Sequence, residues 1–389
     1  MSRDLTRNIS LLAACQALLF TNNVTLIALN GLVGYQLAAD KSFATLPVTT
    51  QVIGSALFAM AASRLMQRIG RRAGFLVGTL CGLVGGGIAT FGVYAHSMAL
   101  LCLGTFILGI YSAFGQFYRF AAADVAPAHF KAKAISLVVA GGLIGGIVGP
   151  AMSKWTRTLA ETEFLASYAS LMGFCILTAL ILSQLRIADP VASENAAPAR
   201  ALRVIAMQPV FIVAVMSSAF GHGVMNLLMT ATPLAMGVCG HPYNAAADVI
   251  TAHVIAMFAP SFFTGSLIVR FGVLKIMLTG VALMFACVAV SLSGVSVAHF
   301  SWSLVLLGLG WNFMFVGGST LLTECYQPNE KANAQGFHDL LVFCITATSS
   351  FLSGLILKAN GWNTLNYVAL PVLVFAGGAM VWLMWRRRV

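Results

Sequence analysis

The stretch "SRLMQRIGRR", residues 63–72, lies between two apolar runs and contains four arginines and one glycine. Each flanking run is long enough to cross a hydrocarbon core about 30 Å thick as an α-helix. A short cationic connection between two such runs is typical of a cytoplasmic loop in a helical membrane protein. Apolar runs of similar length recur on both sides of this stretch to the ends of the chain, which predicts a multi-pass membrane protein.

The composition agrees with an all-α integral membrane protein. Of the 389 residues, 59% are hydrophobic and 8% are charged, a balance that excludes a soluble protein with a charged surface. Breaks at glycine, proline and charged clusters predict twelve transmembrane helices. The predicted spans are 8–37, 43–67, 73–95, 98–122, 132–155, 163–186, 207–236, 246–269, 273–294, 298–323, 332–358 and 362–385.

A polar segment divides the predicted spans equally. The stretch "IADPVASENAAPARALR", residues 187–203, is rich in alanine and proline and interrupts the apolar pattern at the middle of the chain. We expect an N-terminal six-helix half (1–186), a cytoplasmic linker (187–206) and a C-terminal six-helix half (207–389).

The net charge of +11 is distributed unevenly. Lysines and arginines concentrate in every second connection and at the C-terminus, whereas the opposite connections carry few of them. This positive-inside pattern predicts that both termini are cytoplasmic. Because membrane orientation accounts for the excess of cations, no nucleic-acid partner is expected.

The two predicted halves share short sequence features. "RIGRR" after the second span corresponds to "RFGVLK" after the eighth, so that Gly70 matches Gly272. "KAKA" at the start of the fifth span corresponds to "KANA" at the start of the eleventh, and Gly109 corresponds to Gly310. The nearly constant displacement predicts two pseudo-symmetric halves, an arrangement common among transporters.

With these features the chain resembles the major facilitator superfamily (MFS) over essentially its whole length. The loop after the second span is similar to the gating loop of that family. The matching residues are Arg68, Gly70, Arg71 and Arg72. Two positions depart from the family pattern, since Ser63 replaces a usual glycine and Gln67 replaces a usual aspartate. The resemblance implies transport by alternating access.

Two neighbouring spans carry soft metal ligands. In "GHGVMNLLMTATP", residues 221–233, Met225 and Met229 are four residues apart, and in "TAHVIAMFAP", residues 251–260, His253 and Met257 repeat that spacing. Residues four apart share one helix face, and the two pairs lie at matching depths in the membrane. Thioether and imidazole ligands suit copper. Two interpretations remain open, because methionine also fills irregular core space and a pore-lining histidine can bond to a neighbour.

These paired motifs resemble those of the CcoA-type copper importers of the same superfamily. The resemblance implies a bacterial inner-membrane copper importer that supplies cytochrome c oxidase biogenesis. Met225, Met229, His253 and Met257 would bind copper as the transported substrate. The implied partners are copper, membrane lipid and a cytoplasmic copper chaperone, with no prosthetic group. The alternative is an MFS facilitator or exporter of a small organic solute or drug.

Further polar residues are candidates for accessory roles. His222 shares the helix face of the methionine pair, and Cys239 and His241 are expected at the outer mouth, so copper capture is one interpretation and ordinary packing the other. His338 and Asp339 lie inside the eleventh span, where they indicate either proton coupling or a structural polar pair. With no clustered carboxylates and no nucleophile beside a base, the sequence does not predict an enzyme.

Overall fold

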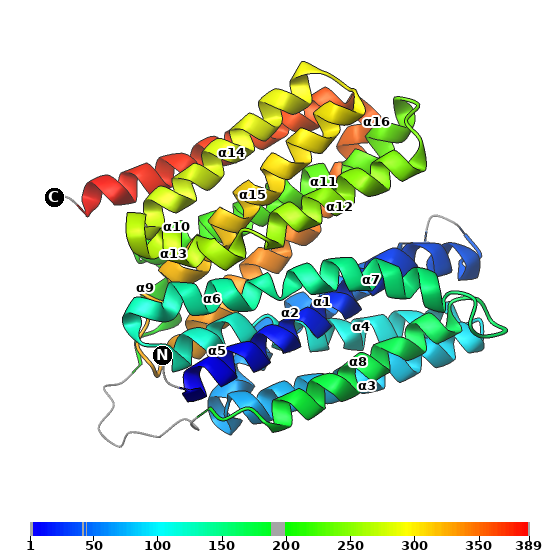
Figure 1. Cartoon of the computed structure of the whole chain (residues 1–389), viewed down its shortest axis with the longest axis horizontal. Helices are drawn as coiled ribbons and strands as arrows, with labels where there is room; N and C mark the ends of the chain where they lie inside the picture. Colours follow the sequence, from blue (N-terminus) through cyan, green and yellow to red (C-terminus); the bar gives the residue numbers. More distant parts are fainter. Residues whose placement is uncertain (1–2, 41–42, 44, 188–198, 388–389) are drawn as a thin grey trace. The chain divides into compact units, whose positions relative to one another are not determined.

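The computed structural model describes residues 3–40, 43, 45–187 and 199–387, and in that part of the chain all regular structure is helical (Figure 1). Ten of these helices are long and apolar enough to cross a membrane, and the bent pair Asn244–Phe258 with Ser261–Phe271 provides an eleventh span. The longest helix, Lys331–Arg386, is two helices joined across a kink at Gly361, which makes twelve spans. The predicted all-helical fold is confirmed.

The helices closely follow the predicted spans. In the first part of the chain they are α1 (Arg3–Leu37), α2 (Leu46–Ile69), α3 (Arg71–Tyr94), α4 (Met98–Gly115), α5 (Tyr118–Val125), η2 (Ala128–Phe130), α6 (Lys131–Ala140), α7 (Gly142–Thr156) and α8 (Leu165–Ser183). In the second part they are α9 (Leu202–Ala206), α10 (Pro209–Val215), η3 (Met216–Phe220), α11 (Gly221–Val238), α12 (Tyr243–Phe258), α13 (Ser261–Phe271), α14 (Val273–Ser293), α15 (Val297–Leu322) and α16 (Lys331–Arg386). Of the predicted linker 187–206, residues 188–198 lie outside the described residues.

Local signals explain several helix boundaries. Ser97 caps α4 by accepting a hydrogen bond from the backbone of Leu100, and Ser296 caps α15 by accepting one from the backbone of His299. Proline near the start of α2 and of α10 is tolerated because the first turn of a helix leaves its backbone N–H groups without intrahelical partners. Pro260 lies in the break between α12 and α13, where the two helices meet at a bend of 41°.

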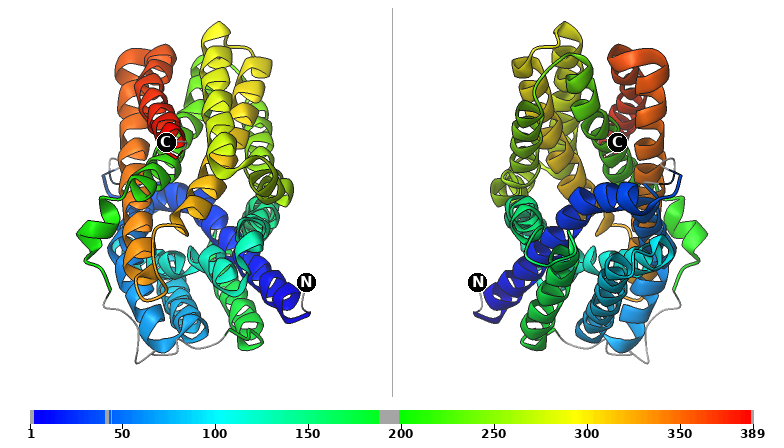
Figure 2. Two further views of the ribbon diagram at one scale, coloured as in Figure 1. Left: turned by 90° about the vertical axis from the view of Figure 1, so that its left-hand side faces the viewer. Right: turned by 90° about the vertical axis from the view of Figure 1, so that its right-hand side faces the viewer.

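The chain forms two compact units. Unit 1 comprises Met1–Ala126, Gly141–Pro198 and Gln335–Leu340, and unit 2 comprises Pro127–Ala140, Ala199–Ala334 and Leu341–Val389. Each unit therefore contains one short segment whose sequence neighbours belong to the other unit. Within unit 2, α14 and α15 lie side by side, as both views of Figure 2 show in yellow.

The predicted internal repeat is visible in backbone geometry. Gly70 between α2 and α3 has φ 86° and ψ 158°, and Gly272 between α13 and α14 has φ 90° and ψ 147°. Glycine is favoured at both turns because side chains rarely adopt positive φ. Close packing shows a second correspondence, since Gly109 lies against Gln51 and Ser55, and Gly308 lies against His253 and Met257. By this packing the counterpart of Gly109 is Gly308, two residues before the predicted Gly310.

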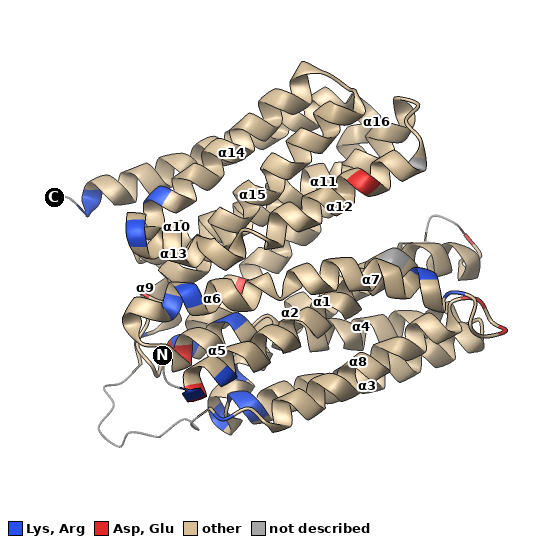
Figure 3. Ribbon diagram, in the orientation of Figure 1, with Lys and Arg blue, Asp and Glu red and all other residues tan. Residues whose placement is uncertain are grey.

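Several charged residues of unit 2 lie at helix ends (Figure 3). Arg270 lies in the last turn of α13, Lys275 in the first turn of α14 and Arg386 in the last turn of α16. The central helices α11 and α15 contain no Lys, Arg, Asp or Glu at all. This distribution fits helices whose middle turns cross the hydrocarbon core, where an unpaired charge is costly.

Candidate functional site

The four predicted copper ligands all lie in unit 2, on the neighbouring helices α11 and α12. Met225 and Met257 are buried, Met229 is partly buried, and His253 is completely buried. Their assignment as a ligand set remains a prediction. Among the described residues, no three His, Cys, Asp or Glu side chains come together as a metal site, and the predicted set is of another kind because three of its four ligands are thioethers.

The His253 ring is fixed by α15. Its Nδ1 atom lies 2.7 Å from the carbonyl oxygen of Leu304. A carbonyl oxygen can only accept, so Nδ1 carries the hydrogen and Nε2 keeps a lone pair in the neutral ring. Within the described residues Nε2 is buried and has no hydrogen-bond partner. This arrangement orients a histidine for metal binding, and it equally provides an acceptor for an N–H or O–H group.

A polar contact secures α12 and α13 to α15 next to Met257. The Asn312 Nδ2 atom donates to the Met257 carbonyl oxygen at 2.6 Å and to Ser261 Oγ at 2.5 Å. Thr264 Oγ1 donates to Asn312 Oδ1 at 2.7 Å. The bend before Ser261 frees backbone groups from the helical pattern, and Asn312 supplies a partner for one of them, the Met257 carbonyl.

The predicted capture residues do not lie together. Cys239 is exposed at the end of α11, and His241 follows it, with Nε2 2.7 Å from the carbonyl oxygen of Val295. His222 lies at the opposite end of α11, about 25 Å from Cys239 along the helix axis by the rise of 1.5 Å per residue. His222 therefore belongs to a different environment from the other two residues.

His222 is part of an aromatic cluster that hydropathy did not predict. The other members are Phe258 from α12 and Trp311 and Phe315 from α15. Trp311 Nε1 donates to His222 Nδ1 at 3.0 Å, and the Phe315 ring lies 4.8 Å from the His222 ring, edge to face. Trp311 stacks on Phe315 with centroids 5.0 Å apart, and Phe258 meets Trp311 edge-on at 5.5 Å. Phe258, Trp311 and Phe315 are buried, and His222 is partly buried.

This aromatic cluster has a defined chemistry. Because the Nδ1 atom of His222 accepts the indole N–H, the neutral imidazole carries its own hydrogen on Nε2. Rings that stack or meet edge to face provide a polarisable surface for another planar ring. The sequence signal is "WNFMF", residues 311–315, in which Trp311 and Phe315 share one helix face. Just before His222, η3 is a π-helix, a local irregularity frequent at functional sites.

Unit 1 contains a contrasting cluster, the amide network of Asn23, Asn30, Gln51, Ser112 and Tyr168. Asn23 Oδ1 accepts from Ser112 Oγ at 2.6 Å and from Gln51 Nε2 at 3.5 Å. Gln51 Oε1 accepts from Asn30 Nδ2 at 3.2 Å, and Asn30 Oδ1 accepts from the Tyr168 hydroxyl at 2.6 Å. Asn23 is partly buried, whereas the other four residues are buried. The network holds the Asn23 amide in a single orientation.

Asp339 lies in a buried ion pair of unit 1. Its Oδ1 atom is 2.6 Å from Arg119 Nη2 and 2.8 Å from His338 Nδ1. Arg119 also lies over the Phe120 ring, 4.4 Å from its centroid. Asp339 Oδ2 and His338 Nε2 are buried without a hydrogen-bond partner among the described residues. The arrangement places a carboxylate between two cationic or protonatable groups, which suits either a structural pair or a proton site.

The predicted gating loop makes specific contacts. Arg71 is buried, with Nη2 3.0 Å from Asp124 Oδ2 and 2.6 Å from Gln335 Oε1. Arg72 Nη2 donates to the Ser183 carbonyl oxygen at 2.7 Å, and Arg68 is exposed. Asp124 therefore supplies a carboxylate to the loop, although the usual aspartate position of the loop holds a glutamine. The gating role itself remains a prediction.

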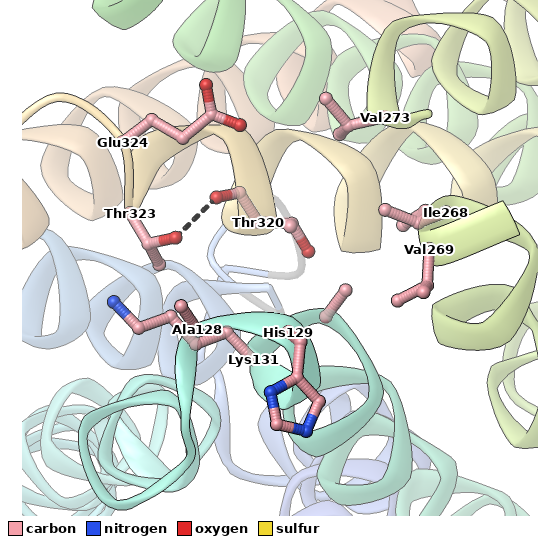
Figure 4. A pocket seen from close by; sticks show the side chains of 10 residues that line it. Ala128, His129, Lys131, Ile268, Val269, Val273, Thr320, Thr323 and Glu324 are labelled. Carbon is pink, nitrogen blue, oxygen red and sulfur yellow. Dashed lines mark hydrogen bonds between the residues drawn. The ribbon is translucent and has the colours of Figure 1, made fainter. Parts of the chain in front are cut away.

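A pocket of about 380 Å³ lies at helix ends of unit 2 (Figure 4). Its lining residues are Ala128, His129, Lys131, Ala132, Ile268, Val269, Val273, Thr320, Thr323 and Glu324. They come from η2 and the start of α6, the end of α13, the start of α14, and the end of α15 with the two residues after it. Neither the predicted copper ligands nor the aromatic cluster line this pocket, so we do not assign it as the substrate site.

Comparison with known proteins gives a full-length match. The model of the Major Facilitator Superfamily matches residues 11–247 and 222–389. The riboflavin transporter RfnT of Brucella anthropi is 40% identical over 370 residues, which are 94% of this chain and 93% of that protein. YdeG of Bacillus subtilis, named an uncharacterized MFS-type transporter, is 28% identical over 376 residues, covering 90% of this chain and 87% of that protein.

Solved structures show the same fold at low sequence identity. The E. coli fucose:proton symporter FucP superposes with a TM-score of 0.73 at 15% identity, covering 97% of this chain and 99% of that one. The proton:xylose symporter XylE gives a TM-score of 0.78 at 14% identity, covering 98% and 95%. The relatives are transporters, so the chain is not an enzyme. It is a multi-pass membrane transporter and belongs to the Major Facilitator Superfamily.

Proposed function

We propose that this protein transports riboflavin or a closely related flavin across the membrane. The observation that carries the proposal is the 40% identity to a riboflavin transporter over 94% of the chain. A match of that length covers most of both units, whereas the copper motifs comprise four residues on two helices. This corresponds to the predicted alternative, a transporter of a small organic solute.

The aromatic cluster supports a planar heteroaromatic substrate. The flavin ring system is flat, polarisable and bordered by hydrogen-bonding nitrogen and oxygen atoms. His222 and Trp311 combine a ring surface with N–H groups, and Phe258 and Phe315 hold them in place. We propose that the His222 side of this cluster contacts the flavin ring. Ring contacts of this kind contribute about 0.5–1.5 kcal/mol each beyond the buried area.

The remaining sequence predictions are carried into this proposal. From the distribution of lysine and arginine we propose a bacterial inner-membrane location with both termini cytoplasmic. We also propose that His338 and Asp339 couple transport to protons, because their unpartnered Nε2 and Oδ2 atoms offer sites for a proton.

Copper import is no longer the favoured function. The riboflavin transporter and the uncharacterized relatives lend no support to a copper substrate, a copper chaperone or a link to cytochrome oxidase. The set Met225, Met229, His253 and Met257 remains a prediction that an uptake measurement can separate from flavin transport.

The test uses bacteria that can neither synthesise nor import riboflavin. Cells expressing the protein should accumulate labelled riboflavin and grow at low external riboflavin, whereas cells with the empty vector should not. Radioactive copper uptake is measured in the same cells. Absence of flavin accumulation by a well-expressed protein in the membrane would contradict the proposal, and accumulation of copper instead would restore the first prediction.

A further inference from the structure

The pocket at the helix ends of unit 2 is bounded by two kinds of surface. All of its lining residues belong to unit 2, in which α6 packs against α13. Figure 4 shows Ile268, Val269 and Val273 together on one side of the pocket, whereas Lys131 and Thr323 lie on the other. A ligand that fills this pocket therefore needs an apolar part next to a polar part.

The polar side of the pocket has a net positive charge. Lys131 is partly buried in the first turn of α6, and His129 is exposed just before it. The acidic residue of the lining is Glu324, whose Oε2 atom lies 2.7 Å from Arg387 Nη2, so its charge is balanced within unit 2. Arg270, in the last turn of α13, adds a further positive charge next to the lining residue Val269. This side of the pocket should attract an anionic group.

The apolar side of the pocket continues onto the surface of α13. Val269 lines the pocket and is 52% exposed, and Phe262, roughly two turns earlier on the same helix face, is 60% exposed. By the rise of 1.5 Å per residue, the two side chains are about 10 Å apart along the helix axis. An exposed apolar surface of this kind on a membrane protein is suited to contact with lipid chains. An acyl chain can therefore lie along α13 from the pocket towards the middle of the span.

We propose that this pocket binds an anionic phospholipid, with the phosphate beside Lys131 and His129 and one acyl chain along α13. The ammonium and imidazole N–H groups can form charge-assisted hydrogen bonds with phosphate oxygens. Basic pockets between transmembrane helices, at the depth of the head groups, are suited to such lipids. Free phosphate would meet the same cations but would leave the apolar side of the pocket without a partner. Because the lipid contacts both α6 and α13, it should stabilise unit 2.

The experiment measures the unfolding temperature of the purified full-length protein in a neutral detergent during titration with dioleoylphosphatidylglycerol. A ligand that binds only the folded protein raises this temperature with its concentration. We expect a saturable rise with phosphatidylglycerol and none with dioleoylphosphatidylcholine, which has the same chains and no net charge. Inorganic phosphate at the same concentrations should have no effect. Equal responses to the two lipids, or the full response with inorganic phosphate, would overturn the proposal.

Three variants locate the response. Lys131→Gln should raise the phosphatidylglycerol concentration at half of the response about tenfold, as expected for one lost charge-assisted hydrogen bond. Val269→Trp keeps every charge and fills the pocket, so it should weaken the response to a similar extent and tests the cavity independently of Lys131. Lys275→Gln is the matched control, because Lys275 is exposed in the first turn of α14 but does not line the pocket. Equal weakening by Lys131→Gln and Lys275→Gln, or a wild-type response of Val269→Trp, would overturn the site.

Discussion

The Oδ1 atom of Asp339 lies 2.6 Å from the Nη2 atom of Arg119, although the two residues are separated by 220 positions in the chain. Both side chains are buried, and both lie in unit 1. The pair holds the segment Gln335–Leu340 in that unit, together with the hydrogen bond from Arg71 to Gln335. A buried charge without its partner is very costly, so each residue should depend strongly on the other.

This dependence predicts unequal effects of single and double substitutions. Arg119→Met and Asp339→Leu should each destabilise the protein by about 3–5 kcal/mol, because each leaves one uncompensated buried charge. The double variant should lose much less stability than the sum of the two single losses, since neither charge of the pair remains. Thermal unfolding of the three variants in detergent measures the coupling. Simple additivity of the two single effects would show that the charges do not stabilise one another.

Proton coupling gives a separate prediction for the same residues. Asp339→Asn keeps the size of the side chain and removes its capacity to ionise. If the Asp339 and His338 pair carries a proton, uptake by this variant should lose most of its dependence on external pH. The measurement is initial uptake across a pH series. Glu163→Gln, which alters an exposed pair with Arg157 outside the spans, should keep the wild-type profile, and an unchanged profile in Asp339→Asn would leave a structural role only.

Hydropathy predicted the fold well because each span is determined by local sequence. The predicted ends of the span 273–294 match α14 to within one residue, and the predicted gap between 358 and 362 contains the kink at Gly361. The partnership of Arg119 with Asp339 depends on tertiary structure, and no local pattern specifies it. For the same reason the sequence did not predict that Pro127–Ala140 and Gln335–Leu340 pack with the opposite units.

The substrate prediction failed to gain support for a different reason. A Met-x-x-x-Met pair reports only that two side chains share a helix face, and Met225 and Met257 are as buried as ordinary core residues. The aromatic cluster could not be predicted from the sequence either, because Trp311 and Phe315 have the pattern of ordinary core residues on a very apolar helix. Only the structure brings His222 to them from another helix.

The close contact of α12 with α15 predicts sensitivity at Gly308. A Cβ atom there would lie 2.7 Å from the carbonyl oxygen of His253, closer than real Cβ contacts allow. Gly308→Ala should therefore push the two helices apart and lower stability by about 1–3 kcal/mol. Thermal unfolding in detergent tests this. Gly173→Ala, on the open side of α8, should be harmless, and equal stability of the two variants would contradict the packing argument.

The Arg200–Glu330 pair predicts a pH-dependent contribution to stability. Hydrogen bonds from the Arg200 guanidinium lower the pKa of Glu330 from 4.5 to about 2, and the carboxylate also accepts from two backbone N–H groups. Since the folded pKa is depressed, the stabilisation is complete above pH 4.5 and is lost as the pH falls towards 2. Glu330→Gln should therefore lower the free energy of unfolding by about 2 kcal/mol at neutral pH. This figure allows for the screening of the partly exposed arginine by solvent.

Unfolding temperatures of wild type and Glu330→Gln at several pH values provide the measurement. The difference between them should be largest at pH 7 and should shrink below pH 4.5. A difference that stays constant down to acidic pH would show that ionisation of Glu330 does not stabilise the fold. At pH 7, Glu163→Gln, whose carboxylate is exposed, should show a smaller difference than Glu330→Gln.

The sharpest prediction separates flavin transport from copper transport. His222→Ala removes the partly buried ring of the aromatic cluster, and riboflavin uptake should fall about tenfold, equivalent to about 1.4 kcal/mol of lost binding. Trp311→Phe keeps a ring but removes the N–H that orients His222, so a smaller loss is expected. Initial rates of labelled riboflavin uptake, normalised to the amount of protein in the membrane, provide the measurement.

Methionine substitutions supply the control, because they preserve apolar volume while removing a soft ligand. Met225→Leu should keep riboflavin uptake within about twofold, since such exchanges in a core usually cost under about 1.5 kcal/mol. Met380→Leu, at a completely buried position on α16 outside the predicted ligand set, should behave in the same way. Copper uptake is measured in parallel for both variants and for His253→Ala. If the wild type accumulates copper, and Met225→Leu and His253→Ala abolish this while Met380→Leu does not, the four-residue copper site is real and flavin cannot be the only substrate.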